Sequence, residues 1–183
     1  MDLLMSLWLP VVLSAAAVWM WSFLSWAAMD LHGRDWLRAP DEDALMSAIR
    51  QLSIKPGAYM FPKATHAQAK DPAVQEKFRV GPMGLLVVFG PVSMPVNMLA
   101  TFALNLLTSF LIAYVAAEAL TPGASFGKVV QVVGTVGVLT YAFAPLPEKI
   151  WFQGRTHAKV MCVVDGLVQG LATGAMFAAL WPK

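Results

Sequence analysis

The residues of this chain that could do chemistry inside a membrane gather in its last apolar stretch, at positions 160–181. Asp165, Gln169 and Thr173 stand there four residues apart, so a helix places all three along one face. A carboxylate in a membrane span is costly and normally faces protein or water rather than lipid. Residues of this kind mark ion, proton or substrate pathways, or hold helices together by hydrogen bonds. We therefore expect another part of the chain to meet this face.

A stripe of glycines lies beside the polar face. Gly166, Gly170 and Gly174 each follow one of the polar residues by one position. Small residues at four-residue spacing let the backbones of two membrane helices approach closely. The stripe therefore predicts a helix-packing face, directed at another span or at a partner chain. We expect the last span to be the helix around which the others pack.

The composition indicates a membrane protein. The chain has 183 residues, of which 58% are hydrophobic and 13% are charged, whereas soluble domains carry about 25% charged residues. The net charge of +2 is too small to indicate nucleic-acid binding. The single cysteine, Cys162, excludes an internal disulfide. The apolar N-terminal stretch follows Met1-Asp2 without a basic residue, which favours a retained anchor over a secretory signal.

Four apolar stretches reach the length of about 20 residues that a helix needs to cross a bilayer. They predict spans at about 4–29, 95–118, 128–147 and 160–181. The predicted fold class is all-α, an integral membrane four-helix bundle. We expect one membrane domain over residues 1–183, with short amphipathic helices in the polar loop at 30–82.

The polar loop contains two predicted helix starts. Pro40 followed by three acidic residues favours a helix N-terminus, and Asp71 before Pro72 favours a second. The segment 83–95 that follows the loop is apolar but interrupted by prolines. We interpret it as an interfacial or re-entrant lead-in to the second span; one long helix kinked at Pro91 is the alternative.

Basic residues predict the topology. The two loops at 30–82 and 148–159 carry 11 of the 13 lysines and arginines. Basic residues in short loops mark the cytoplasmic side. The sequence therefore predicts a multi-pass protein with both of these loops in the cytoplasm and both termini outside.

The other spans also carry polar residues, and we expect their polar faces to turn inward. The second and third spans contribute Asn97, Thr101, Asn105 and Gln131. One interpretation is that these groups only hold the bundle together. The other is a polar pathway or ligand cavity lined by these residues with the last span. Arg155, His157 or Lys159 is the expected partner of Asp165, since all three lie near the same end.

No catalytic motif stands out. The histidines His32, His66 and His157 lie in loops, so the spans offer no histidine to a haem. A metal site built from them has no supporting spacing such as HExxH or CxxC, and no phosphate-binding or nucleophile-elbow motif occurs. Charged residues at the span ends could form an interfacial catalytic site: Asp30, His32, Arg34, Asp35, Glu148 and His157. Such residues are usually solvated, so we predict no catalytic residue, metal or cofactor.

A tryptophan-bearing first span leads into Gly33-Arg34-Asp35-Trp36 and the acidic start at 40–46, and Val164-Asp165-Gly166 lies near the other end. With these segments, both ends of the chain resemble a family of small bacterial membrane proteins classed as a domain of unknown function. The resemblance implies a four-span bundle in the bacterial inner (plasma) membrane. It implies no activity and no catalytic residues.

These features favour a non-enzymatic protein over an enzyme. The first hypothesis is a structural or accessory subunit of a membrane complex or homo-oligomer. The second is a small-solute transporter or channel that uses the polar faces of spans two to four, and an interfacial enzyme comes third. The expected partners are the lipid bilayer and other membrane protein chains, the same or different, and not nucleic acid.

Overall fold

The computed structural model describes residues 2–152 and 154–183. The chain divides into two units, of which one comprises Met1–Leu37 with Met94–Lys183 and the other Arg38–Ser93. The prediction of one membrane domain over the whole chain stays a prediction.

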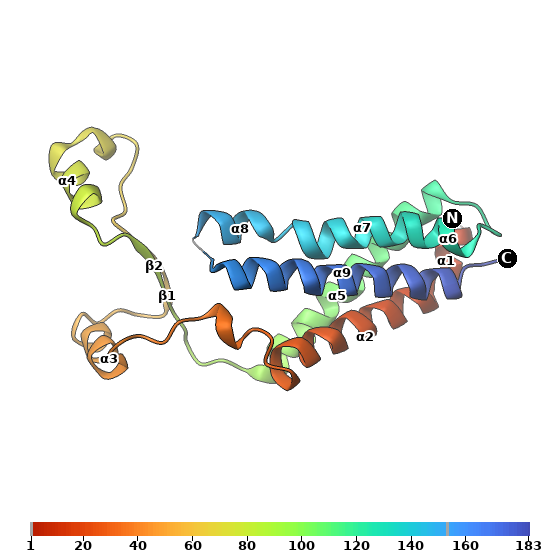
Figure 1. Ribbon diagram of the computed structural model, residues 1–183, viewed down its shortest axis with the longest axis horizontal. Coiled ribbons are helices and arrows are strands. Elements are labelled where there is room, and N and C mark those ends of the chain that lie inside the picture. The colour runs from red at the N-terminus through yellow and green to blue at the C-terminus, as the bar shows by residue number, and fades with distance from the viewer. Residues whose placement is uncertain (1, 153) are drawn as a thin grey trace. The chain divides into compact units, whose positions relative to one another are not determined.

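Four helices in the described part of the chain are long and apolar enough to cross a membrane: Trp8–Ala28, Met94–Ala119, Phe126–Trp151 and Thr156–Ala179. They form the first unit and confirm the predicted all-α four-helix bundle (Figure 1). Its elements are α1 (Asp2–Ser6), α2 (Trp8–Phe23), the π-helical η1 (Leu24–Ala28), the 3-10 helix η2 (Gly33–Asp35), α5 (Met94–Ala119), α6 (Phe126–Val129), η4 (Val130–Gly134), α7 (Thr135–Val138), η5 (Leu139–Phe143), α8 (Leu146–Trp151) and α9 (Thr156–Ala179).

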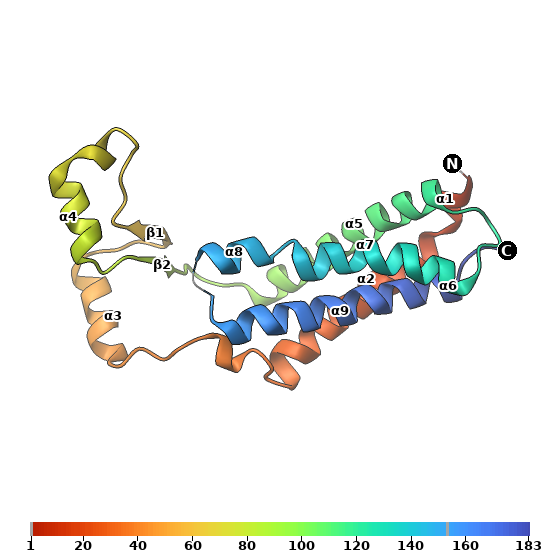
Figure 2. The ribbon, with the colours of Figure 1, turned by 45° about the horizontal axis from the view of Figure 1, so that its top comes forward.

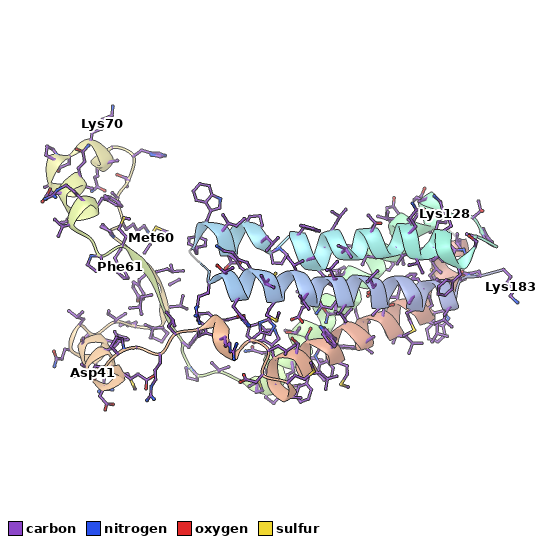
Figure 3. All side chains as sticks on the ribbon, viewed as in Figure 1. Asp41, Met60, Phe61, Lys70, Lys128 and Lys183 are labelled. Carbon is purple, nitrogen blue, oxygen red and sulfur yellow. The ribbon has the colours of Figure 1, made fainter. Side chains whose placement is uncertain are left out.

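Helix α9 lies between α2 and the third span, which runs from α6 to α8, whereas α5 packs mainly on α2 and touches η4 (Figures 1 and 2). The last span therefore packs against both α2 and the third span, whereas α5 is joined to the bundle mainly by its contact with α2. We call the end where η1 stops and α9 begins the loop end, and the opposite end the core end. Lys128 and Lys183 lie at the core end (Figure 3).

The apolar core occupies the core end. The cluster of buried residues there consists of Leu7, Ile112, Ala113, Ala116, Leu120, Val129, Val133, Phe177, Ala178 and Trp181. All four long helices or their extensions contribute to it. The loop end is instead held by polar contacts, so apolar and polar packing are separated along the bundle.

The glycine stripe of α9 faces the third span. A side chain at Gly166 would fall on the backbone of Ala142, and a Cβ at Gly170 would lie 2.5 Å from the backbone nitrogen of Val138. A Cβ at Gly174 would lie 3.0 Å from Gly134. Gly166 meets η5, Gly170 meets α7 and Gly174 meets η4, so the stripe follows the third span along three successive segments. The stripe therefore packs against this chain.

The ends of the spans differ from the predicted ones. Helix α9 begins at Thr156 rather than at position 160, and the third helix continues through α8 to Trp151. The sequence predicts that this span ends at Pro147, but proline also suits the first turn of a helix, and Pro147 lies in the first turn of α8. The second polar loop, predicted at 148–159, is therefore much shorter.

The second unit contains α3 (Glu42–Gln51), β1 (Gly57–Phe61), the 3-10 helix η3 (Gln68–Lys70), α4 (Pro72–Val80) and β2 (Gly84–Val88). Both predicted helix starts are confirmed. The Asp41 carboxylate accepts a hydrogen bond from the Ala44 amide at 2.8 Å, and that of Asp71 accepts one from the Ala73 amide at 2.8 Å. Helix α4 ends at Val80, and Gly81 follows it with a φ of 68°, which suits glycine.

The apolar segment after the loop is not helical. Residues 84–88 form strand β2, which pairs antiparallel with β1, and α5 begins only at Met94. The alternative of one long kinked helix over this segment is therefore wrong. The interfacial or re-entrant position of the segment stays a prediction. The strand was hard to foresee because its partner lies far back along the chain: 31 residues separate the pair Gly57 and Val88 at the open end of the hairpin, and 23 residues separate Phe61 and Gly84 at the other end.

Candidate functional site

The carboxylate of Asp165 is the centre of a buried hydrogen-bond network at the loop end of the bundle. Trp21 donates from Nε1 to Oδ1 at 3.0 Å, and the Ser25 hydroxyl lies 2.9 Å from Oδ1 and 3.0 Å from Oδ2. Nε2 of His32 lies 2.8 Å from Oδ2. Asp165 is only 8% exposed. The face predicted to need a partner therefore finds it in the end of the first span and the turn that follows.

The π-helical end of the first span helps to place these partners. Segment η1 carries Ser25, whose carbonyl accepts the Leu31 amide at 3.0 Å. The chain then turns at Asp30, which has a left-handed φ of 47°, and the Gly33 amide lies 3.3 Å from the Asp30 carbonyl. A Cβ at Gly33 would lie 2.5 Å from the Asp30 carboxylate, so a larger residue there would require the Asp30 side chain to move. The turn brings His32 back against α9.

The network continues from His32 toward the surface. Nδ1 of His32 lies 2.6 Å from Oδ2 of Asp35, which is three residues away because of the 3-10 turn η2. Nδ1 of His157, in the first turn of α9, lies 2.8 Å from Oδ1 of Asp35. The His32 and Asp35 side chains are 5% exposed, whereas that of His157 is 32% exposed. The four groups thus run from the bundle interior to its surface.

Two further contacts hold the turn in place. The Trp26 ring stacks on that of His32, with centroids 3.9 Å apart and planes 6° from parallel. The Arg155 guanidinium donates to the carbonyl of Arg34. The Arg155 contact joins the turn after the first span to the residue before α9, so distant parts of the sequence meet at this end of the bundle.

The arrangement compensates buried charge. Each ring nitrogen of His32 faces a carboxylate oxygen, which is the geometry of an imidazolium that donates two hydrogen bonds. A protonated His32 would place one cation between Asp35 and Asp165, and this would offset the cost of holding both carboxylates away from water. Alternating carboxylate and imidazole groups also resemble the chains that relay protons in membrane proteins. The network therefore suits both a structural and a proton-conducting role.

The electrostatics of Asp35 follow from its surroundings. Burial acts to raise its pKa, but the hydrogen bonds from His157 and His32, together with their charges, lower it further than burial raises it. The folded-state pKa of Asp35 therefore lies below its ordinary value of 3.8. Folding favours the ionised form of this carboxylate.

This shift predicts a loss of stability in acid. Because the folded-state pKa is depressed, the contribution of Asp35 is complete above pH 3.8 and is lost as the pH falls through the lower folded-state pKa. His32 and His157 are the groups that face Asp35. Thermal unfolding in detergent between about pH 6 and pH 3 measures this effect. The native chain should have a higher thermal midpoint than Asp35→Asn at about pH 6, and this difference should be lost below about pH 4. Parallel curves for the two proteins would contradict this prediction.

The structure brings together only some of the polar residues predicted to share a face. Gln169 donates from Nε2 to the Ser22 hydroxyl at 3.0 Å, and the Thr173 hydroxyl donates to the Gln169 carbonyl at 2.8 Å. Thr173 and Asn105 are buried, but Asn97, Thr101 and Gln131 are exposed on the outside of the bundle. The expectation that all polar faces turn inward is therefore wrong for Asn97, Thr101 and Gln131.

The reason lies in which part of α5 is packed. Thr101 and Asn97 lie about one and two turns before Asn105, where the buried part of α5 begins. The inward face of α5 is set by its buried residues from Asn105 to Ala116. Thr101 bonds its own helix, at 2.8 Å from the Asn97 carbonyl.

The sequence missed the residue that pairs with Asp165. Arg155, His157 and Lys159 were expected, but His32 makes the contact, and His157 reaches Asp35 instead. One signal was present, since His32 and Asp35 were noted among the charged residues at the end of the first span. No group of three or more His, Cys, Asp or Glu in residues 2–152 and 154–183 is arranged to hold a metal ion.

The fold and the site define the class of the protein as a multi-pass membrane four-helix bundle with a buried histidine–aspartate network at one end. Comparisons with protein-family models, with curated proteins and with solved structures gave no match.

Proposed function

We propose that this protein is a non-enzymatic integral membrane protein that works as an accessory or structural subunit. In this proposal the bundle is an anchor in the bacterial inner membrane, with both termini outside, and the unit Arg38–Ser93 is a cytoplasmic element that another membrane protein chain completes. The basic residues of the two loops support the orientation. The resemblance of both chain ends to a bacterial membrane family supports the location.

The observation that carries the proposal is the lack of a core in the second unit. No residue from Arg38 to Ser93 is buried. In the hairpin, side chains alternate between two faces, and one face holds Ala58, Met60, Leu85 and Val87 while the other holds Tyr59, Phe61, Leu86 and Val88. Both faces are apolar, and a two-stranded hairpin is marginally stable alone.

Large apolar side chains on this unit are open to a partner. Met60 is 51% exposed, Leu85 48% and Val87 46%; Met60 and Phe61 are labelled on the hairpin in Figure 3. The outer edges of both strands are also free, since the sheet within this unit has two strands. An apolar two-sided hairpin with open edges is typical of a surface that pairs with another chain.

Photo-crosslinking in native membranes tests this proposal. A photoreactive amino acid at Val87, on the apolar hairpin face, should give an adduct with a second protein chain, the same or different. The same group at Lys70, which is exposed in the 3-10 helix η3, is the matched control and should give little. Purification in mild detergent should recover the same partner. Adducts with lipid alone, or a monomer without a partner, would overturn the proposal.

A small-solute transporter or channel remains a second candidate. It is favoured by the buried polar groups of α2, α5 and α9, which extend from the network at the loop end toward the middle of the bundle. Uptake assays in proteoliposomes would distinguish it from an accessory subunit, because an accessory subunit transports nothing by itself.

A further inference from the structure

Four buried polar atoms inside the bundle make no hydrogen bond within residues 2–152 and 154–183. They are the hydroxyls of Ser14, Ser109 and Tyr141 and the side-chain nitrogen of Asn105. Ser14 and Ser109 are 0% exposed and Asn105 is 8% exposed. Unpartnered polar groups are rare in folded proteins and especially costly in a membrane, where lipid offers no hydrogen bonds. Four of them in one bundle therefore need an explanation.

These groups lie close together. The Tyr141 hydroxyl lies near the hydroxyls of Ser109 and Thr173, although neither the Tyr141 nor the Ser109 hydroxyl meets a partner at both the distance and the angle of a hydrogen bond. Asn105 precedes Ser109 by four residues, so it follows on the same side of α5 one turn away. Tyr141 belongs to η5 and Thr173 to α9, so three of the four spans contribute to this group.

Helix α2 supplies the remaining group at the same level. Its Trp19 donates to the Met98 carbonyl of α5 at 3.2 Å and packs edge-on against Phe102. The two helices run antiparallel (Figure 2), so Ser14, five residues before Trp19, lies level with the part of α5 around Asn105. We call Ser14, Asn105, Ser109, Tyr141 and Thr173 the central polar cluster.

The chemistry of the cluster restricts what it binds. Hydroxyl groups both donate and accept hydrogen bonds, an amide nitrogen donates only, and none of these groups is charged at neutral pH. A small neutral molecule that donates and accepts matches them, and water is the smallest. An inorganic cation does not fit the donating amide nitrogen, and an anion has no basic residue among these five.

The cluster is continuous with the network in one direction only. Toward the loop end, Thr173 bonds the Gln169 carbonyl, Gln169 bonds Ser22, and Ser25 bonds Asp165. Toward the core end lies the apolar cluster that includes Ile112, Ala113 and Phe177. Polar groups thus line the bundle from His157 at the surface to its middle, and apolar side chains close the rest.

We propose that the central polar cluster is a water-binding site inside the bundle, reached from the loop end and closed at the core end. The bound water accepts from the Asn105 amide and links the hydroxyls of Ser14, Ser109 and Tyr141. This proposal does not depend on the proposed accessory role. A bundle with this site has hydrated polar groups from its loop end to its middle.

Substitutions in the central polar cluster should change the thermal midpoint Tm in opposite directions, depending on whether the cluster holds water or is dry. If the groups share water, Ser109→Ala and Tyr141→Phe should each lower the thermal midpoint Tm by roughly 2–4 °C, and the double variant should lose less than the sum. If the groups are dry, removing an unpartnered polar group should raise Tm. Thr140→Val is the control, because its hydroxyl bonds the Val136 carbonyl of its own helix at 2.8 Å. An unchanged or higher Tm for both single variants would overturn the proposal.

Hydroxyl-radical footprinting by X-ray radiolysis tests for the water directly, because radicals form from water next to the side chain they modify. The full chain in detergent should show oxidation of Tyr141 despite its buried hydroxyl. Phe177, which is 0% exposed in the apolar cluster, should be protected. Protection of Tyr141 equal to that of Phe177 would overturn the proposal whatever the stabilities show.

Discussion

Replacement of His32 by alanine should lower the free energy of unfolding by about 3–5 kcal/mol, because breaking a buried ion pair leaves an uncompensated charge. His32 contacts Asp165 at 2.8 Å and Asp35 at 2.6 Å. Without the ring, two carboxylates lose the group that they share, and Trp26 loses the ring on which it stacks. The turn after the first span should then detach from α9.

Thermal unfolding of the full chain in detergent measures this effect. His66→Ala is the matched control, since His66 is an exposed histidine in the unit Arg38–Ser93 and should leave the Tm unchanged. The His32→Ala loss should shrink in an Asp165→Asn background, because the charge that His32 compensates is then absent. Equal losses in both backgrounds would show that His32 acts through packing alone.

Replacement of Gly166 by valine should also be strongly destabilising. Any side chain at this position falls on the Ala142 backbone, so α9 and the third span must separate. Overpacking a close contact costs typically about 1–3 kcal/mol and sometimes more. Loss of the close helix contact would also weaken the neighbouring pair Gly170 and Val138. We expect a lower Tm and a lower yield of folded protein.

Gly127→Ala is the matched control for the glycine prediction. Gly127 lies in α6, and a Cβ there meets nothing within 4 Å. Alanine favours a helix over glycine by up to about 1 kcal/mol, so this variant should be as stable as the native chain or slightly more so. If Gly166→Val were equally stable, α9 and the third span would not be in close contact, and the glycine face would be free for a partner chain.

The second unit shows where sequence patterns reach their limit. Asp41 and Asp71 were predicted as helix starts because a cap is formed by residues two or three positions apart. Strand β2 was not predicted, because its apolar residues also suit a membrane lead-in. Only pairing with β1, far back along the chain, distinguishes the two.

The sequence by itself determined the four spans and the glycine stripe as a candidate packing face. Span length and apolarity are local properties, set by the thickness of the bilayer. The tertiary structure alone decided the partner of Asp165. His32 lies 133 positions away, and it arrives there through the π-helical end of the first span and the turn at Asp30. A helix face reveals that a buried acid needs a partner, but three-dimensional packing decides which cation meets it.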